Sequence, residues 1–315
     1  MNDFAPVLIC TLNRHVHFKR CVESLAACTY AEKTDLFIGL DYPLKDTHWE
    51  GYEIIKAYLP KIRGFRTVNI VERDRNYGVF ENWLNMQKYV FQRYDRVIIS
   101  EDDNVFAKSF LVYVNGGLCK FEKDPLVLAV CGYKFPFDIP SSYPYNYFYS
   151  KSFSGWGFGI WRNKDTAHNW NENSIQEINR YLHNPWKAFR LNSFQYGLIN
   201  GLMNIVKSGK ITGDRMYCFS NLLNGTYSVF PTVSKVRNTG HDGTGVHCTK
   251  IDYKNNRFVC QPIDTEPHFN YLSHSEYENK IVKNALKKHI MSYTSLRIHH
   301  KIKLFIEYII FVFKY

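Results

Sequence analysis

The stretch YDRVIISEDDNVFAKSFLVY, from Tyr94 to Tyr113, places three acids directly behind an apolar run. Glu101, Asp102 and Asp103 repel one another as neighbours, and burying them without partners would cost free energy. The chain as a whole carries a net charge of +11, so this run of carboxylates opposes its overall charge. Two interpretations are open: a solvated turn that caps the following helix, or a site that awaits a cation.

The first 130 residues alternate between short apolar segments and segments with helical spacing. The apolar segments recur about every 30 residues, and amphipathic runs lie between them. Alternation of this kind is typical of βαβ units, so it predicts an α/β fold with a mostly parallel sheet flanked by helices. The expected strands cover residues 6–12, 36–41, 66–71 and 96–100.

Polar residues follow every one of these expected strands. They are Asn13 and Arg14 after the first, Asp41 after the second, Arg73 and Asn76 after the third, and the three acids after the fourth. Sheets of this class bind ligands at the carboxyl ends of their strands. A solvated turn would not need polar residues at all four ends, so the placement favours a nucleotide-type crevice.

The first strand is followed by TLNRH, which is neither a GxGxxG loop nor a P-loop. A dinucleotide dehydrogenase and a P-loop NTPase are therefore disfavoured. A diphosphate bound at this edge would need a metal ion instead, and the acids could hold one.

Composition places the chain among ordinary folded proteins, with 45% hydrophobic and 22% charged residues. Its eight cysteines are scattered and form no CxxC pair, so a reducing cytosol is expected. The apolar run near the start is short for a signal peptide, and no apolar run is long enough to span a bilayer. The excess of Lys and Arg fits an anionic partner, but no nucleic-acid motif is present, so nucleic acid is disfavoured.

Three segments carry a resemblance to a known family: APVLICTLNRHVHFKRCVESL, IGLD and VIISEDDNVFAKSFLVYV. They resemble nucleotide-sugar-dependent glycosyltransferases of the GT-A fold. The nearest likeness is to the N-acetylglucosaminyltransferase I type and to bacterial family-2-like enzymes. The resemblance runs from Ala5 to Cys248 and is strongest in the first 130 residues.

The resemblance implies roles for particular residues. Asp103 would contact Mn²⁺, Glu101 and Asp102 would hold the sugar and the ribose, Arg14 would bind the donor, and Asp41 would contact the uracil base. The segment SGWGFGIW, from Ser154 to Trp161, is similar to the glycine-aromatic segment before the family's catalytic region. The family's general base would fall on Asp214 of TGDRMYCF, although a long helical insertion precedes it and its neighbours differ from the pattern.

The chemistry of glycosyl transfer agrees with these residue types. A divalent ion stabilises the charge that builds on a departing diphosphate, and hard oxygen ligands suit Mn²⁺ or Mg²⁺. The acceptor hydroxyl needs a general base, commonly Asp or Glu. Trp156, on a glycine-flanked turn, could form an apolar wall for a sugar or could simply be core packing.

The segment VSKVRNTGHDGTGVHC, from Val233 to Cys248, suggests a lid. Its glycines allow close approach to a ligand, and Lys235, Arg237 or His247 could touch the diphosphate or the metal. A surface turn with incidental histidines is the alternative. A structural zinc site built from His241, His247, Cys248 and Cys260 fits no common ligand spacing.

The last part of the chain is basic and then apolar from Leu304 to Phe313. Ten helical residues reach about 15 Å, half of a bilayer core, so this segment cannot span a membrane. A helix lying on an anionic membrane is predicted. A helix packed on the main domain or on a second subunit is the alternative.

Together these features predict a metal-dependent glycosyltransferase that moves a sugar from a UDP-sugar to a saccharide acceptor, with inversion. We expect a lipid-linked acceptor in bacterial surface polysaccharide synthesis and a cytoplasmic enzyme on the inner face of the cell membrane. Residues 1–132 would bind the donor, 133–272 the acceptor, and 273–315 form the tail. A sugar nucleotidyltransferase and a non-catalytic membrane-associated protein on a transferase scaffold are the alternatives.

Overall fold

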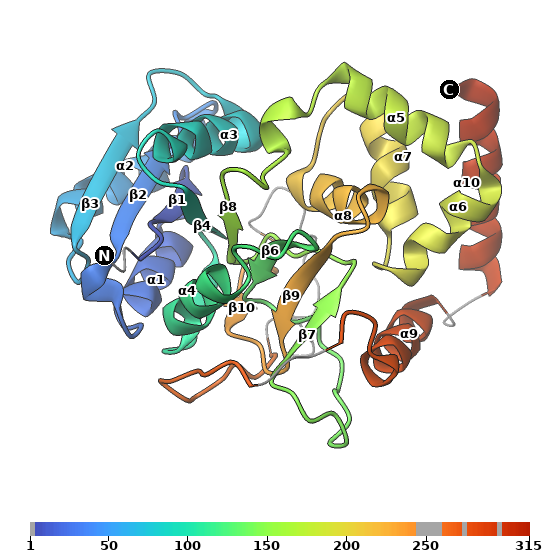
Figure 1. Cartoon of the computed structure of the whole chain (residues 1–315). Helices are drawn as coiled ribbons and strands as arrows, with labels where there is room; N and C mark the ends of the chain where they lie inside the picture. Colours follow the sequence, from blue (N-terminus) through green and yellow to red (C-terminus); the bar gives the residue numbers. More distant parts are fainter. Residues whose placement is uncertain (1–3, 244–259, 273–275, 295–297) are drawn as a thin grey trace.

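The computed structural model describes residues 4–243, 260–272, 276–294 and 298–315. Within these residues an eight-stranded sheet forms the centre, in the order β3-β2-β1-β4-β8-β6-β9-β7 (Figure 1). Its strands are β1 (Val7–Thr11), β2 (Asp35–Leu40), β3 (Thr67–Glu72), β4 (Arg96–Glu101), β6 (Val127–Cys131), β7 (Tyr147–Ser150), β8 (Phe158–Trp161) and β9 (Tyr227–Pro231).

The first four strands are parallel, and each is joined to the next through a helix. These helices are α1 (His15–Ala26), α2 (Asp46–Tyr58) and α3 (Gly78–Phe91). Beyond β4 the sheet becomes mixed, because β8 runs antiparallel to both β4 and β6 while β9 is parallel to β6. The edge strand β7 is antiparallel to β9. The predicted α/β fold with a mostly parallel sheet is confirmed, since four of the seven strand pairs are parallel.

Helices cover both faces of the sheet because strand side chains alternate between the faces. On β1, Val7 and Ile9 pack with α1, α2 and α4 (Phe110–Lys120), whereas Leu8 packs on the opposite side with α3. That second side also carries the helical group α5 (Glu172–Leu182), α6 (Pro185–Arg190), α7 (Leu198–Ser208) and α8 (Gly213–Leu223). Short 3₁₀ helices lie at Ala31–Lys33, Leu59–Lys61, Ala167–Asn169 and Leu191–Ser193.

A second, two-stranded sheet begins directly after the three acids. Glu101 is the last residue of β4, and the chain turns at once into β5 (Asn104–Phe106), which pairs antiparallel with β10 (Val236–Asn238). The next helix, α4, starts only at Phe110. The acids therefore lie in a turn between two strands, and the interpretation that they cap a helix does not hold.

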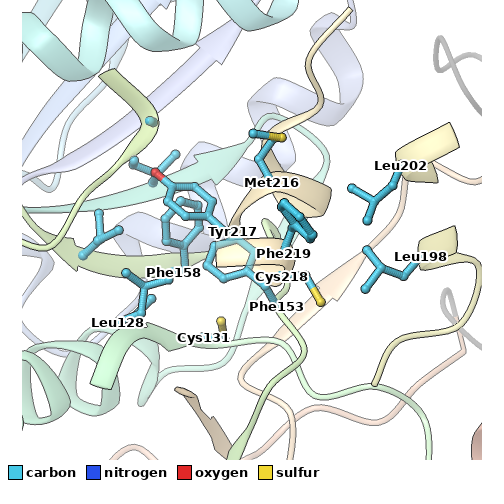
Figure 2. Close-up of a cluster of buried hydrophobic side chains, with 14 of the residues drawn as sticks. Leu128, Cys131, Phe153, Phe158, Leu198, Leu202, Met216, Tyr217, Cys218 and Phe219 are labelled. Atoms are coloured by element: carbon cyan, nitrogen blue, oxygen red, sulfur yellow. The ribbon is translucent and has the colours of Figure 1, made fainter. Parts of the chain in front are cut away.

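Helix α8 is fixed by a dense apolar core. Figure 2 shows Met216, Tyr217 and Phe219 of this helix among side chains of the sheet and of α7. Their neighbours include Leu128 and Cys131 of β6, Phe158 of β8, and Leu198 and Leu202 of α7. This packing holds the amino-terminal end of α8, which carries Asp214, in a defined place relative to the sheet.

The carboxyl-terminal region forms two helices, α9 (Lys280–Thr294) and α10 (Ile298–Lys314). The predicted helical tail is therefore present. Helix α10 packs against the helical group: Tyr308 and Phe311 are buried, and the Tyr308 hydroxyl donates to the backbone carbonyl of Leu182 at 2.7 Å. Figure 1 shows α10 beside α5 and α6. Among the described residues no helix has the length and apolar character needed to cross a membrane.

Candidate active site

The carboxyl ends of β1 and β4 bring Arg14 onto two of the three acids. The guanidinium of Arg14 bridges Asp102 and Asp103, with Nη2 donating to Asp102 Oδ1 and lying 2.8 Å from Asp103 Oδ2. Thr11, at the end of β1, donates its hydroxyl to Asp102 Oδ2 at 2.8 Å. Burial raises the pKa of Asp102, and the nearby Arg14 opposes that rise. The two aspartates are therefore buried with partners, which avoids the cost of unpaired charge.

The turn after β10 closes on Asp103 from the second half of the chain. Asn238 donates its side-chain amide to Asp103 Oδ1 at 2.6 Å. Thr239 donates both its backbone N–H, at 2.9 Å, and its hydroxyl, at 2.7 Å, to the backbone carbonyl of Asp103. The Thr239 hydroxyl also accepts a hydrogen bond from Arg20 of α1. These contacts fix Asp103 between two segments that lie 135 residues apart in the sequence.

Gly240 completes this turn because no side chain fits there. A Cβ atom at Gly240 would lie 1.9 Å from Asp103 Oδ2 and 2.9 Å from Arg14 Nη1. Its backbone N–H donates instead to the side-chain carbonyl of Asn238 at 2.9 Å. The close approach of the backbone to a carboxylate is the reason for glycine at this position.

Asp103 is also the residue assigned from the sequence to Mn²⁺ or Mg²⁺. Both of its carboxylate oxygens accept hydrogen bonds within the protein, one from Asn238 and one from Arg14. Across the described ranges, no three His, Cys, Asp or Glu side chains are grouped in a way that could hold a metal by themselves. Mg²⁺ is commonly bound through one or two carboxylates together with substrate phosphates. Asp103 fits an ion of that kind once Arg14 turns from Oδ2 toward the phosphates.

Glu101 is the third acid at this edge, and its side chain is exposed by surface area. Partial desolvation of its carboxyl, together with the charges of Asp103 and Asp214, raises the pKa of Glu101 from its ordinary 4.5 to about 8. Asp214 lies in the first turn of α8, and a Cβ built on Gly155 of the SGWG turn would be 4.0 Å from the Asp214 Cβ. Asp214 therefore lies next to the SGWG turn and close enough to Glu101 for its charge to act on that carboxyl.

Asp41 is buried and holds the loop that leads into α3. Its Oδ1 accepts the backbone N–H groups of Tyr42 and Tyr77, at 2.9 and 2.8 Å. Its Oδ2 accepts the N–H of Gly78 at 2.9 Å and the side-chain amide of Asn76 at 3.4 Å. Asn76 also donates to the carbonyl of Tyr42 at 2.6 Å. The structure thus brings the two predicted donor residues together, and four N–H groups of the protein already point at the Asp41 carboxylate.

Trp156 lies between the core and the acidic edge. Its ring meets Tyr133 edge-on at 4.5 Å and His241 at 5.5 Å between ring centroids. His241 follows Gly240 directly and is close enough to Asp103 for the carboxylate to act on its pKa, which burial lowers overall. Asp242, the next residue, pairs with His17 of α1 at 3.1 Å. The segment after β10 therefore lies over α1 and the acids.

Other predicted residues lie elsewhere. Lys235 is buried, pairs with Asp264 and packs its ammonium over the Phe269 ring at 4.5 Å, so it is not among the groups around Asp103. Arg237 lies opposite Val105 in the two-stranded sheet. Asn13 begins the turn before α1, and its carbonyl would be 1.9 Å from a Cβ on Gly51 of α2. His247 and Cys248 lie outside the described residues, so the lid and zinc-site expectations are not addressed.

Three residues of this turn were not among the predicted site residues: Asn238 and Thr239, which bind Asp103, and Gly240, which gives the backbone room beside the carboxylate. A signal for them exists, because NTG is typical of a turn. The predicted basic residues Lys235 and Arg237 precede the turn rather than form it.

The sequence matches no protein-family model and no curated protein. Among solved structures, the chain is similar to the mannosyltransferase PcManGT from Pyrobaculum calidifontis in complex with GDP-Man and Mn²⁺. That match has 15% sequence identity over 51% of this chain and 45% of that chain, with a TM-score of 0.35. It is also similar to S. aureus TarS 1-349 in complex with UDP-GlcNAc, with 15% identity over 40% of this chain and 32% of that chain, at a TM-score of 0.29.

The chain therefore spans less than half the length of either solved protein. At these scores the likeness is confined to part of the fold, and it carries no weight for the activity of this chain. Neither likeness bears on the resemblance to the N-acetylglucosaminyltransferase I type.

Proposed function

We propose that this chain is a nucleotide-sugar glycosyltransferase that moves a sugar from a UDP-sugar to a saccharide acceptor. One observation supports the proposal: Asp214, from the second half of the chain, is close enough for its charge to act on Glu101, which follows β4 in the first half together with Asp102, Asp103 and their partner Arg14. Transfer needs both a cationic environment for the diphosphate and a carboxylate for the acceptor hydroxyl. Arg14 and a divalent ion held by Asp103 would meet the first requirement, and Asp214 would meet the second.

On the donor side, Arg14 would bind the diphosphate. It leaves one carboxylate oxygen of Asp103 free when it turns to a phosphate, and Asp102 keeps its hydrogen bond from Thr11. Asp103 would hold Mn²⁺ or Mg²⁺, and such an ion stabilises the negative charge that develops on the leaving diphosphate. Asp41 and Asn76 shape the pocket for the nucleoside by fixing residues 76–78.

On the acceptor side, Asp214 takes the proton from the attacking hydroxyl. Its side chain is 43% exposed, so an acceptor can reach it, and its pairing with Arg215 is long, at 3.8 Å. A single displacement with one base inverts the anomeric centre. Trp156 supplies an apolar ring near this place, which suits the face of a sugar. A saccharide acceptor on a lipid carrier, in the synthesis of a bacterial surface polysaccharide, fits this arrangement.

The test compares Asp214→Asn with the control Glu172→Gln, which removes an exposed acid from the first turn of α5. Purified protein is incubated with UDP-sugars, Mn²⁺ and saccharide acceptors, and both transfer and UDP binding are measured. Asp214→Asn should lower transfer by about 10²–10⁴-fold, the usual contribution of a general base. UDP binding should stay near the wild-type value, and Glu172→Gln should behave like wild type.

Two results would contradict the proposal. If Asp214→Asn transfers normally, Asp214 is not the base; if it loses UDP binding, it belongs to the donor pocket. In the same assay EDTA should stop transfer and added Mn²⁺ should restore it. Full activity in EDTA would show that transfer does not need a divalent ion. Release of pyrophosphate from UTP and a sugar phosphate would identify a nucleotidyltransferase instead.

A further inference from the structure

Helix α10 is apolar on two sides, and only one side faces the protein. Tyr308 and Phe311 are buried against the helical group, while Leu304 and Val312 are partly buried beside them. The remaining apolar side chains repeat at intervals of three and four residues, which places them on one outward stripe. Their exposed fractions are 52% for Ile302, 53% for Phe305, 51% for Ile306, 38% for Ile309, 57% for Ile310 and 88% for Phe313.

Helix α6 extends this stripe from a distant part of the sequence. The ring of Phe189 stacks on that of Phe305, with 6.2 Å between centroids, and is itself 40% exposed. Trp186 stands one turn earlier on α6 and is 84% exposed. We call these eight residues the α6–α10 face: Trp186, Phe189, Ile302, Phe305, Ile306, Ile309, Ile310 and Phe313. Exposed apolar surface this concentrated marks an interaction site.

The charge of the segments that carry the face indicates what covers it. In the sequence, residues 280–315 contain eight Lys or Arg residues and one acid, Glu307. On α6, Lys187 and Arg190 are exposed next to the aromatic side chains. A second copy of this chain would bring the same positive charge against itself. An anionic lipid surface complements it, because each Lys or Arg near such a surface is attracted to it.

We propose that the α6–α10 face binds an anionic membrane, with the axis of α10 in the plane of the surface. The apolar stripe enters the boundary between headgroups and acyl chains, the flanking lysines and arginines contact the headgroups, and Trp186 lies at the interface where tryptophan is favoured. Because Tyr308 and Phe311 tie α10 to the body, the whole molecule is held at a fixed orientation. The proposed membrane binding by the α6–α10 face does not depend on the proposed transferase activity.

The experiment measures co-sedimentation of the full chain with vesicles of phosphatidylcholine, with and without phosphatidylglycerol. Wild type should sediment with the anionic vesicles and progressively less as salt rises. Trp186→Ser and Phe313→Ser should each weaken binding about tenfold, because each removes one inserted apolar side chain. Leu44→Ser is the matched control, since Leu44 is 67% exposed and lies outside the face. Unfolding curves check that all variants are folded.

The fluorescence of Trp186 supplies a second readout. Because Trp186 belongs to α6, it tests whether α6 as well as the carboxyl-terminal tail meets the membrane. Lipids brominated on their acyl chains should quench wild-type tryptophan fluorescence, and Trp186→Phe should remove that quenching although five other tryptophans remain. The proposal is overturned if wild type stays in the supernatant with anionic vesicles or if the two serine variants bind like Leu44→Ser. It is equally overturned if those variants change only self-association in sedimentation velocity, which would assign the face to a second copy.

Discussion

At the scale of single residues, the fold disfavours the ionised form of Glu101. Asp102 and Asp103 share Arg14, whereas desolvation and the charges of Asp103 and Asp214 raise the pKa of Glu101 to about 8. The folded protein thus binds this proton more tightly than the unfolded chain. The stability that the folded protein gains from binding this proton is fully present below pH 4.5, the ordinary pKa of Glu101. It is lost as the pH rises through about 8.

Glu101→Gln should therefore stabilise the protein while impairing its function, because the amide cannot ionise. The gain in Tm over wild type should be absent near pH 4.5 and should grow as the pH rises toward 8. Thermal unfolding at a series of pH values measures it. Glu122→Gln, at an exposed position after α4, controls for the general effect of removing one negative charge. A Tm difference that is constant with pH would show that Glu101 ionises in the fold as it does in the unfolded chain.

At the scale of elements, the turn after β10 is the piece that completes the site. It reaches Asp103 because β10 pairs with β5, which starts immediately after the acids. Gly240→Ala should break this fit, since the new Cβ would lie 1.9 Å from Asp103 Oδ2. We expect donor affinity to fall about tenfold or more, as hydrogen bonds to a buried charged group are lost.

Binding of UDP in the presence of Mn²⁺, followed by calorimetry, measures this effect. The control is Gly209→Ala: that glycine has a φ of +67° and no atom within 4 Å of a built Cβ. Its substitution strains the backbone after α7 without touching the site, so it should lower stability and leave UDP affinity unchanged. Wild-type affinity in Gly240→Ala would mean that the turn moves freely and does not position Asp103.

At the scale of the whole molecule, α10 has one side packed against the protein and one side exposed. Phe311 is fully buried and Phe313 is 88% exposed, although they are two residues apart. Phe311→Ala should lower the free energy of unfolding by about 3–5 kcal/mol, and Phe313→Ala should change it by less than about 0.5 kcal/mol. Urea unfolding of both variants measures the difference. Equal effects would mean that α10 is not docked as described, and the membrane orientation would lose its basis.

Much of the fold could be predicted from the sequence because its signals are local. The recurrence of buried strands and amphipathic helices fixes the βαβ units, and the end of each apolar run places Arg14, Asp41 and the acids at the same edge. The candidate donor residues follow from that placement alone. The helices of the carboxyl-terminal region could likewise be predicted, because composition and period lie within one segment.

Only the tertiary structure decides which distant groups meet. Nothing local indicates that Asn238 bonds to Asp103, that the charge of Asp214 acts on Glu101, or that Phe189 stacks on Phe305. These contacts depend on the order of β8, β6 and β9 in the mixed half of the sheet and on the packing of α8 and α10. Periodicity reports which side of an element is buried but not which partner buries it, since many partners satisfy the same apolar pattern. Lys235 shows the same limit: its charge was visible in the sequence, and its partner Asp264 was not.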